Sequence, residues 1–191
     1  MGNDTLLGGA DDDLLQGSTG NDIINGGTGT GDTVTYADMT GGTGVTVDLA
    51  ITIQQNTGAG GLDTITLTEN LTGSGFADTL FGNSGDNVIK GGAGDDTIAG
   101  RLGADTLSGD GGNDAFVFNS GDDGDTITDF QAGGTEDFLD LRTFGFGDFN
   151  EVLALATDDG TDTTIDFGNG DTIVLQNVDK TALTANDFLL A

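Results

Sequence analysis

A nine-residue repeat runs through this chain and constrains its fold more than any other feature of the sequence. From Gly73 the chain reads GSGFADTLF, GNSGDNVIK, GGAGDDTIA, GRLGADTLS and GDGGNDAFV without a gap, and GSTGNDIIN occurs from Gly17. Tandem copies of one short unit are typical of solenoids, in which each unit packs only against its neighbours. The sequence therefore predicts a stacked, elongated array.

Each nonapeptide divides into a six-residue turn and a three-residue strand. Glycines at positions one, two and four permit positive φ, so we expect a tight turn whose carbonyl oxygens point inward. The strand carries one large apolar side chain at position eight, which we expect to point into the roll. These interior positions are Leu6, Leu15, Ile24, Val34, Leu80, Ile89, Ile98, Leu107 and Phe116.

Two nonapeptides make one full coil, so turns on the same edge are expected to recur every eighteen residues. An Asp at position six then meets its counterpart one coil later. The expected pairs are Asp78 with Asp96, Asn87 with Asp105, Asp96 with Asp114, Asp4 with Asp22, and Asp13 with Asp32 after one extra residue in GGTGTGDTV. The turn after Asp114 is ambiguous, because both Asp123 and Asp125 are placed to close a site with Asp105.

The acidic residues of the chain require an explanation that involves cations. The chain has 33 Asp and Glu against 4 Lys and Arg, a formal net charge of −29. Because like charges repel one another in a compact fold, such a chain is either disordered or neutralised by bound cations. Hydrophobic residues make up 35% and are regularly spaced, which favours order that depends on cations. Nucleic acid and anionic membranes are excluded as partners, since both require clusters of Lys and Arg.

The residue types that are absent narrow the chemistry further. Without Cys and His, only oxygen ligands remain for a metal. Loops with many carbonyl and carboxylate oxygens suit Ca²⁺ better than Mg²⁺, which requires a stricter octahedron. The same absences remove Ser-His and Cys-His nucleophile pairs, and the chain contains no HExxH or GxSxG motif. Carboxylate pairs for glycoside chemistry stay open, but each regularly spaced Asp already has a calcium role, so we expect a non-catalytic module.

The repeats resemble the haemolysin-type RTX (repeats-in-toxin) calcium-binding nonapeptide, GGxGxDxUx. This resemblance covers essentially the whole chain. It implies an all-β fold, a right-handed parallel β-roll or β-solenoid with several Ca²⁺ ions in the turns and an aromatic-rich C-terminal cap. It also implies that each ion takes carbonyls from positions two and four and the Asp of one turn, together with carbonyls from positions one and three and the Asp of the turn one coil later.

Carried onto this chain, the family's ligand scheme implies three sites in the second block of repeats. The site that matches the consensus best uses Gly92, Gly94 and Asp96 with Gly109, Gly111 and Asp114. A second site uses Ser74, Phe76 and Asp78 with Gly91, Ala93 and Asp96. A third site uses Asn83, Gly85 and Asn87 with Gly100, Leu102 and Asp105. The remaining candidates are Asp4, Asp13, Gly17, Thr19, Asp22, Gly26, Thr28, Asp32, Arg101, Gly103, Asp123 and Asp125. Phe76 and Asp11 replace a consensus glycine, and Asn87 replaces the carboxylate, so we expect the Asn87 site to bind calcium less tightly.

The repeat register divides the chain into four segments: a first nonapeptide block (1–34), an insert (35–72), a second block (73–125) and a C-terminal cap (126–191). In the insert, GVTVDLAITI and LDTITLTENLTGS alternate apolar residues with Thr or Asp, which predicts exposed strands in longer coils that continue the solenoid. A flat, Thr-rich ligand-binding face, including an ice-binding one, is the alternative.

The cap differs in composition, since nine of the 11 phenylalanines lie from Phe116 onward. We expect a short helix around DFNEVLALA and two strands, TDTTIDF and DTIVLQNV, joined by Gly168 to Gly170. Such an atypical terminal unit covers the last apolar layer of a solenoid. The final LTANDFLLA resembles the C-terminal end of RTX substrates of type I secretion systems, and a last strand or helix that packs on the cap is equally compatible.

These features imply a secreted, extracellular or cell-surface protein, exported by a type I secretion apparatus without a cleaved N-terminal signal. No basic segment precedes an apolar run at the N-terminus, and no stretch is long and apolar enough to span a membrane. Met1 begins midway through a repeat, which suggests an upstream catalytic or adhesive domain. We expect calcium-induced folding that follows export and stabilises an extracellular protein. One alternative is a calcium-dependent carbohydrate-binding or adhesive module, although the lack of Trp and the single Tyr36 argue against sugar stacking on aromatic rings. The other is a structural surface-layer role.

Overall fold

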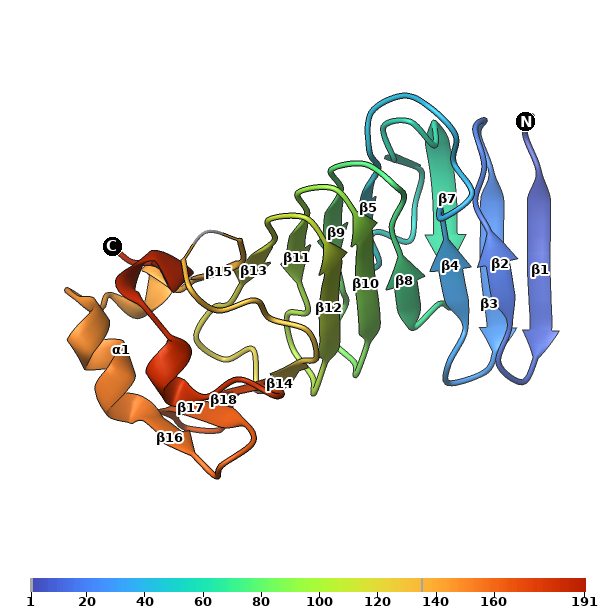
Figure 1. Ribbon diagram of the computed structural model, residues 1–191. Helices are drawn as coiled ribbons and strands as arrows, with labels where there is room; N and C mark the ends of the chain where they lie inside the picture. Colours follow the sequence, from blue (N-terminus) through green and yellow to red (C-terminus); the bar gives the residue numbers. More distant parts are fainter. Residues whose placement is uncertain (1, 135) are drawn as a thin grey trace.

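Short strands stack into an elongated roll along residues 2–134 and 136–191, the part of the chain that the computed structural model describes. The N-terminal strands lie at one end and the helix-containing C-terminal segment at the other (Figure 1). A nine-stranded sheet has the order β16 (Ala156–Asp158), β17 (Thr163–Gly168), β18 (Asp171–Leu175), β14 (Gly124–Ile127), β12 (Thr106–Gly111), β10 (Val88–Ala93), β8 (Asn70–Thr72), β4 (Thr33–Thr35), β2 (Leu14–Gln16). A six-stranded sheet has the order β19 (Phe188–Leu189), β15 (Phe138–Asp140), β13 (Ala115–Val117), β11 (Thr97–Ala99), β9 (Thr79–Phe81), β5 (Thr46–Asp48). A four-stranded sheet has the order β1 (Thr5–Ala10), β3 (Ile23–Thr28), β7 (Leu62–Thr66), β6 (Gln55–Asn56).

Parallel pairing between strands one coil apart confirms the predicted period. Ile89 of β10 pairs with Leu107 of β12, eighteen residues later. Leu15 of β2 pairs with Val34 of β4, so the extra residue of the first block is absorbed in the turn between them. The fold is therefore a parallel β-roll, as expected from the repeats.

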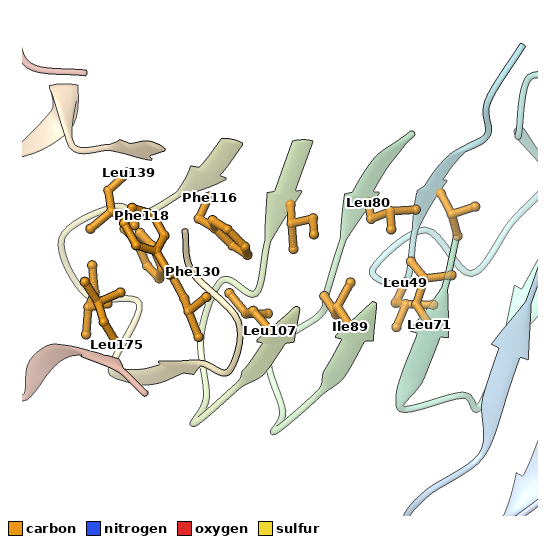
Figure 2. Packing of buried hydrophobic residues seen from close by; sticks show 14 of the residues in the cluster. Leu49, Leu71, Leu80, Ile89, Leu107, Phe116, Phe118, Phe130, Leu139 and Leu175 are labelled. Carbon is orange, nitrogen blue, oxygen red and sulfur yellow. The ribbon is translucent and has the colours of Figure 1, made fainter. Parts of the chain in front are cut away.

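The side chains at position eight form the interior of the roll. All of those predicted from Leu15 to Phe116 are buried, and Leu6 in the first coil is partly buried against them. Figure 2 shows Leu80 and Phe116 from the six-stranded sheet lying opposite Ile89 and Leu107 from the nine-stranded sheet. Burying one such side chain contributes roughly 1.5–3 kcal/mol, so this ladder is the main apolar contribution to stability.

Glycine is required at position one because a larger residue would not fit there. Positive φ, which was expected to be available at positions one, two and four, is adopted at positions two and four only. Gly92 and Gly94, at positions two and four, have φ of +110° and +119° as predicted. Gly91, at position one, does not adopt this left-handed conformation. A Cβ added to Gly91 would collide with the carboxylate of Asp96, because the turn closes on its own position-six side chain.

The insert continues the roll, but less of it is strand than predicted. In the nine-stranded sheet β8 pairs with both β4 and β10, and in the four-stranded sheet β7 pairs with β3. Of the segment GVTVDLAITI, only β5 is a strand. After it, the Asp48 side chain accepts a hydrogen bond from the backbone N–H of Ala50, and the Asp48 carbonyl accepts one from Ile51, which turns the chain away. Because β5, β7 and β8 belong to three different sheets, they do not build one flat Thr-rich face.

The C-terminal segment covers the far end of the roll. The predicted helix is α1 (Phe149–Leu155), whose N-terminus is capped by the side chain of Asp148, and the predicted strand pair is the antiparallel hairpin of β17 and β18. In addition β18 pairs with β14 and β19 pairs with β15, so both main sheets extend into the cap. The 3₁₀ helices are η1 (Arg142–Phe144), η2 (Lys180–Ala182) and η3 (Ala185–Asp187). Within the described residues, every helix is too short or too polar to cross a bilayer.

Candidate metal sites in the turns

Acidic side chains form rows along the edges of the roll, where the turns stack. In each row the carboxylate of one turn accepts a hydrogen bond from the backbone N–H of its counterpart one coil earlier. Thus the N–H of Asp96 donates to Oδ1 of Asp114 at 2.9 Å. The same contact joins Asp78 to Asp96 at 2.7 Å, Asn87 to Asp105 at 2.7 Å, Asp4 to Asp22 at 2.9 Å and Asp13 to Asp32 at 2.8 Å. The structure therefore brings together every pair that the spacing indicated.

The turn after Asp114 uses Asp125 and not Asp123. Oδ1 of Asp125 accepts the N–H of Asp105 at 2.9 Å, and Asp125 is buried. Asp123 is exposed and has a φ of +70°. Because this turn is two residues longer than the repeat, the spacing alone left both residues as candidates.

Sequence reasoning missed three acidic residues that continue the rows outside the nonapeptides. Oδ1 of Asp63 accepts the N–H of Asp22 at 2.9 Å, Oε2 of Glu69 accepts that of Asp32 at 3.0 Å, and Oδ1 of Asp137 accepts that of Asp114 at 3.0 Å. The separations are 41, 37 and 23 residues, so no fixed period finds them. The one sequence signal was the triplet Asp-Thr-Ile beginning at Asp63, which also begins at Asp96.

The second carboxylate oxygen of several row members is buried without a hydrogen-bond partner among the described residues. These oxygens are Oδ2 of Asp13, Asp32, Asp96, Asp105 and Asp125. A buried acceptor without a partner costs roughly 1–3 kcal/mol, and more when it is charged. A hard cation offers what these oxygens lack, since Ca²⁺ takes six to eight oxygen ligands from carboxylates and backbone carbonyls.

Burial also makes the charged carboxylates unfavourable in the metal-free protein. It raises the pKa of Asp96 to about 7 and that of Asp125 to about 8, although a backbone N–H bonded to each carboxylate acts in the opposite direction. The pKa values of Asp105 and Asp114 rise to about 6 for the same reason, and nearby carboxylates add to the effect. A bound divalent cation would favour the ionised forms instead.

Backbone carbonyls complete the donor set at these positions. In residues 2–134 and 136–191, no three acidic side chains converge closely enough to hold a metal ion by themselves. However, a Cβ placed on Gly91 would stand 2.7 Å from the carbonyl oxygen of Gly109 and also against Oδ2 of Asp96. The unbonded carboxylate oxygen and a carbonyl of the next coil therefore face the same small space. This donor set fits Ca²⁺.

Asp22, Asp78 and Asn87 are candidate residues whose side-chain polar atoms are bonded within the protein. Oδ1 of Asp22 accepts the N–H of Asp4, and its Oδ2 accepts the N–H of Ser18 at 3.2 Å. Oδ1 of Asp78 accepts hydrogen bonds from the N–H of Val45 at 2.6 Å and the hydroxyl of Ser74 at 2.8 Å, and Oδ2 accepts from the N–H of Ser74. The amide of Asn87 accepts a bond from the Asn83 N–H at 2.8 Å and donates one to the Glu69 carbonyl at 2.6 Å. These three turns therefore offer fewer free oxygens than the turns of Asp96 and Asp105.

The remaining candidates differ in exposure and in side-chain role. Asp4, in the first coil, is exposed, whereas Asp22 in the next coil is buried. Arg101 and Asp11 stand where the consensus has glycine, and both adopt positive φ, at 76° and 68°. The Arg101 guanidinium binds Asp48 of β5, so only its carbonyl remains available to the turn. Gly17, Thr19, Gly26, Thr28, Gly85, Gly100, Leu102, Gly103, Gly109 and Gly111 lie in or beside the turns as carbonyl candidates.

Comparison with known proteins gives the repeats a family. Residues 1–31, 72–107 and 95–124 match the family model of the RTX calcium-binding nonapeptide repeat (4 copies). Over 123 residues the chain is 46% identical to the endo-1,3-1,4-beta-glycanase EglC and 44% identical to the endo-1,3-1,4-beta-glycanase ExsH, both of Rhizobium meliloti (strain 1021). These matches cover 64% of this chain and 26% of each relative, so the chain spans about a quarter of their length.

Two solved structures are similar to the chain at low sequence identity. One is the extracellular lipase LipA from Serratia marcescens, with 21% identity, 100% of this chain and 38% of that chain covered, and a TM-score of 0.42. The other is the AlgE6R3 subunit of the Azotobacter vinelandii mannuronan C5-epimerase, with 24% identity, 95% and 80% covered, and a TM-score of 0.42.

Proposed function

The chain carries RTX calcium-binding nonapeptide repeats, which bind Ca²⁺ in their turns, and we propose that this binding decides whether the chain folds. The observation that carries the proposal is the set of buried Oδ2 atoms that have no hydrogen-bond partner among the described residues, which make the metal-free roll unfavourable. Each site with free Ca²⁺ at ten times its Kd adds about 1.4 kcal/mol by mass action. Several sites then supply much of a domain's usual stability of about 5–15 kcal/mol.

The proposed ligands are the row carboxylates together with turn carbonyls of two successive coils. The best site combines Gly92, Gly94 and Asp96 with Gly109, Gly111 and Asp114. Calcium supplies the positive charge that lets these carboxylates stay ionised when buried. The chain supplies orientation, since each Oδ1 is held by the backbone N–H of the preceding coil. In this proposal residues 1–34 and 73–125 are the two ion-binding blocks, residues 35–72 connect them, and residues 126–191 cap the roll.

The proposed setting is extracellular, after export by a type I secretion apparatus. In a cytosol poor in Ca²⁺ the 33 acidic residues repel one another and keep the chain unfolded, which suits a narrow export channel. Outside, Ca²⁺ at about 10⁻³ M exceeds the roughly 10⁻⁴ M Kd of typical extracellular calcium modules. The segment 183–191 is the proposed export signal. In this proposal the chain is a non-catalytic module of a larger polysaccharide-acting protein; the matched region is 26% of each glycanase relative, which leaves most of those proteins for other domains.

A calcium titration followed by far-UV circular dichroism tests this function. The protein is first stripped with EDTA and transferred into metal-free buffer, and CaCl₂ is then added, with MgCl₂ as the control. We expect a coil-to-β transition below about 10⁻³ M Ca²⁺ that Mg²⁺ does not produce. A complete β spectrum in metal-free buffer would contradict calcium-gated folding.

A groove beside one row of turns supports a second function, calcium-dependent glycan binding. The groove has a volume of about 720 Å³ and is lined by Leu67, Leu102, Thr52, Asn83, Ser84 and Asn119 among others. Exposed leucines beside amide and hydroxyl groups suit a sugar, which presents both C–H faces and hydroxyls. The name of the relatives, endo-1,3-1,4-beta-glycanases, suggests the ligand class.

Isothermal titration calorimetry with mixed-linkage β-1,3-1,4-glucan oligosaccharides tests the second function. Thr52 lines the groove outside the nonapeptide turns, so Thr52→Arg should block binding and leave the calcium transition unchanged. Thr161→Arg, an exposed change in the cap, is the matched control. Equal heats for both variants and the wild type would exclude the groove as the glycan site.

A further inference from the structure

In the coil of Asp63, two buried hydroxyls from the insert bond the row carboxylate. Asp63 continues the row of Asp4 and Asp22, and its Oδ1 accepts the N–H of Asp22 at 2.9 Å. Its Oδ2 accepts hydrogen bonds from the hydroxyl of Tyr36 at 2.8 Å and from the hydroxyl of Thr57 at 2.7 Å. Tyr36, Thr57 and Asp63 are all 0% exposed. The equivalent Oδ2 of Asp96 has no hydrogen-bond partner within residues 2–134 and 136–191.

The ring of Tyr36 fills the space between two successive turns of this row. A Cβ placed on Gly17, in the turn that ends at Asp22, would stand 2.5 Å from Cε1 of Tyr36. A Cβ placed on Gly60, in the turn that ends at Asp63, would stand 3.0 Å from the same atom. At the turn of Asp96, the corresponding space is lined by the carboxylate oxygen and a backbone carbonyl. The aromatic ring and its hydroxyl therefore occupy the place where the next block presents free oxygens.

We propose that Tyr36 and Thr57 determine where ions bind, by taking the place of a calcium ion between the turns of Asp22 and Asp63. The proposal rests on the proposed function of the other turns as calcium sites. Two hydroxyl donors satisfy Oδ2 of Asp63 as a cation would, so this coil is held together without metal. Tyr36 and Thr57 are thus residues that set ion occupancy, and they come from the insert, not from a nonapeptide.

The position of this coil divides the ions into two groups. Asp78 and Asn87, which border the insert on its C-terminal side, are also bonded within the protein. The unbonded carboxylate oxygens lie before the insert, in Asp13 and Asp32, and after it, in Asp96, Asp105 and Asp125. On the edge of Asp22 and Asp63, the insert is therefore a metal-free step in the row of turns. On the edge of Asp32 it is not, because Oδ2 of Asp32 and the carbonyl of Leu67 both face the space beside Gly26.

A matched pair of substitutions tests the assignment by counting bound ions. Calcium stoichiometry is measured on the whole chain by equilibrium dialysis with atomic absorption, for wild type, Asp63→Asn and Asp96→Asn. At a free Ca²⁺ concentration near the wild-type midpoint, we expect Asp96→Asn to bind fewer ions than wild type and Asp63→Asn to bind the same number. Loss of an ion in Asp63→Asn to the same extent as in Asp96→Asn would overturn the proposal.

A second variant keeps the test informative if Asp63→Asn does not fold. Tyr36→Ala removes a hydroxyl donor and opens the space between the two turns, so we expect it to bind one ion more than wild type. The added ion should disappear in the double variant Tyr36→Ala/Asp63→Asn. An unchanged count in Tyr36→Ala would contradict the proposal.

The same measurements separate this inference from the proposed function. If wild type binds no calcium, or if Asp96→Asn binds as many ions as wild type, the proposal of calcium-gated folding is wrong. If both Asp96→Asn and Asp63→Asn bind fewer ions than wild type, calcium-gated folding still holds. Only the proposal that Tyr36 and Thr57 take the place of an ion is then contradicted. Tyr36 is the one tyrosine in a chain without tryptophan, so the near-UV circular dichroism of its ring reports whether this coil is folded in Asp63→Asn.

Discussion

The backbone N–H of Asp78 donates a hydrogen bond to Oδ1 of Asp96 one coil later, and Oδ2 of the same carboxylate is buried with no hydrogen-bond partner in the part of the chain that the structure describes. One oxygen therefore joins the coils and the other is available to a ligand. Because Asp32 and Asp105 repeat this arrangement, stacking and ion binding depend on the same side chains. A change at one such carboxylate should affect both.

Substitution of Asp96 should weaken calcium binding without removing the hydrogen bond that joins the coils. Asn keeps an oxygen for the N–H of Asp78 but removes a formal charge from the site. We expect the calcium midpoint of the β transition to rise about tenfold, which corresponds to about 1.4 kcal/mol. Asp38→Asn, at an exposed loop position, should leave the midpoint unchanged. Equal midpoints for the two variants would show that Asp96 is not a ligand.

Glycine at position one should be intolerant of any side chain. Gly91→Ala places a methyl group against the Asp96 carboxylate and the carbonyl of Gly109, where overpacking costs typically 1–3 kcal/mol. Gly75→Ala is the matched control, because a Cβ there meets nothing within 4 Å. Thermal unfolding in saturating Ca²⁺ should show a lower Tm for Gly91→Ala only. A similar Tm for the two variants would contradict the steric role of Gly91.

The metal-free protein should become more ordered as the pH falls. The pKa values of Asp96 and Asp125 are raised by burial from 3.8 to about 7 and about 8, so folding favours their protonated forms. This contribution to stability is fully present below about pH 4 and is lost as the pH rises through 7 to 8. We expect more β structure at pH 5 than at pH 8 in metal-free buffer, measured by circular dichroism.

Competition between protons and calcium gives the control for this pH dependence. Because protonated carboxylates are poor ligands, the apparent calcium affinity should fall between pH 8 and pH 6. An affinity that does not change over this range would mean that carboxylates with raised pKa values do not hold the ions.

The contact between Arg101 and Asp48 should stabilise the attachment of the insert to the second block. Arg101 forms two parallel hydrogen bonds to the Asp48 carboxylate, at 2.8 and 2.7 Å, and lies 5.2 Å from the centre of the Phe81 ring. Lys cannot reproduce the paired geometry, so Arg101→Lys should lower the free energy of unfolding by about 1 kcal/mol. Chemical denaturation in saturating Ca²⁺ measures the change.

Arg142→Lys is the matched control for Arg101→Lys. Arg142 forms the same type of pair with Asp140, but its side chain is 61% exposed, compared with 33% for Arg101. Solvent screening should therefore make the effect of Arg142→Lys smaller. If Arg142→Lys is the more destabilising of the two, the Arg101 contact does not attach the insert.

Within the nonapeptide blocks, the burial of the position-eight side chains and the pairing of the position-six side chains followed from the sequence. The pairing of Ile89 with Leu107 and of Asp96 with Asp114 was predictable because each repeat contacts the repeats next to it at a constant spacing. In the cap, α1 and the β17–β18 hairpin were predictable from local patterns, since an Asp cap and a Gly-rich turn act within a few residues. The purpose of Gly91 was not, because its φ is ordinary and only the packed turn shows the collision.

The sequence by itself determined the period, the apolar interior, the rows of Asp and the preference for oxygen-bound cations, because these depend on contacts that repeat at one spacing. Only the tertiary structure decided that Asp63, Glu69 and Asp137 join the rows and that Tyr36 reaches Asp63 across 27 residues. The chain segments between these contacting residues differ in length. Their partners are set by how the irregular segments pack onto the roll, and no periodic pattern encodes that packing.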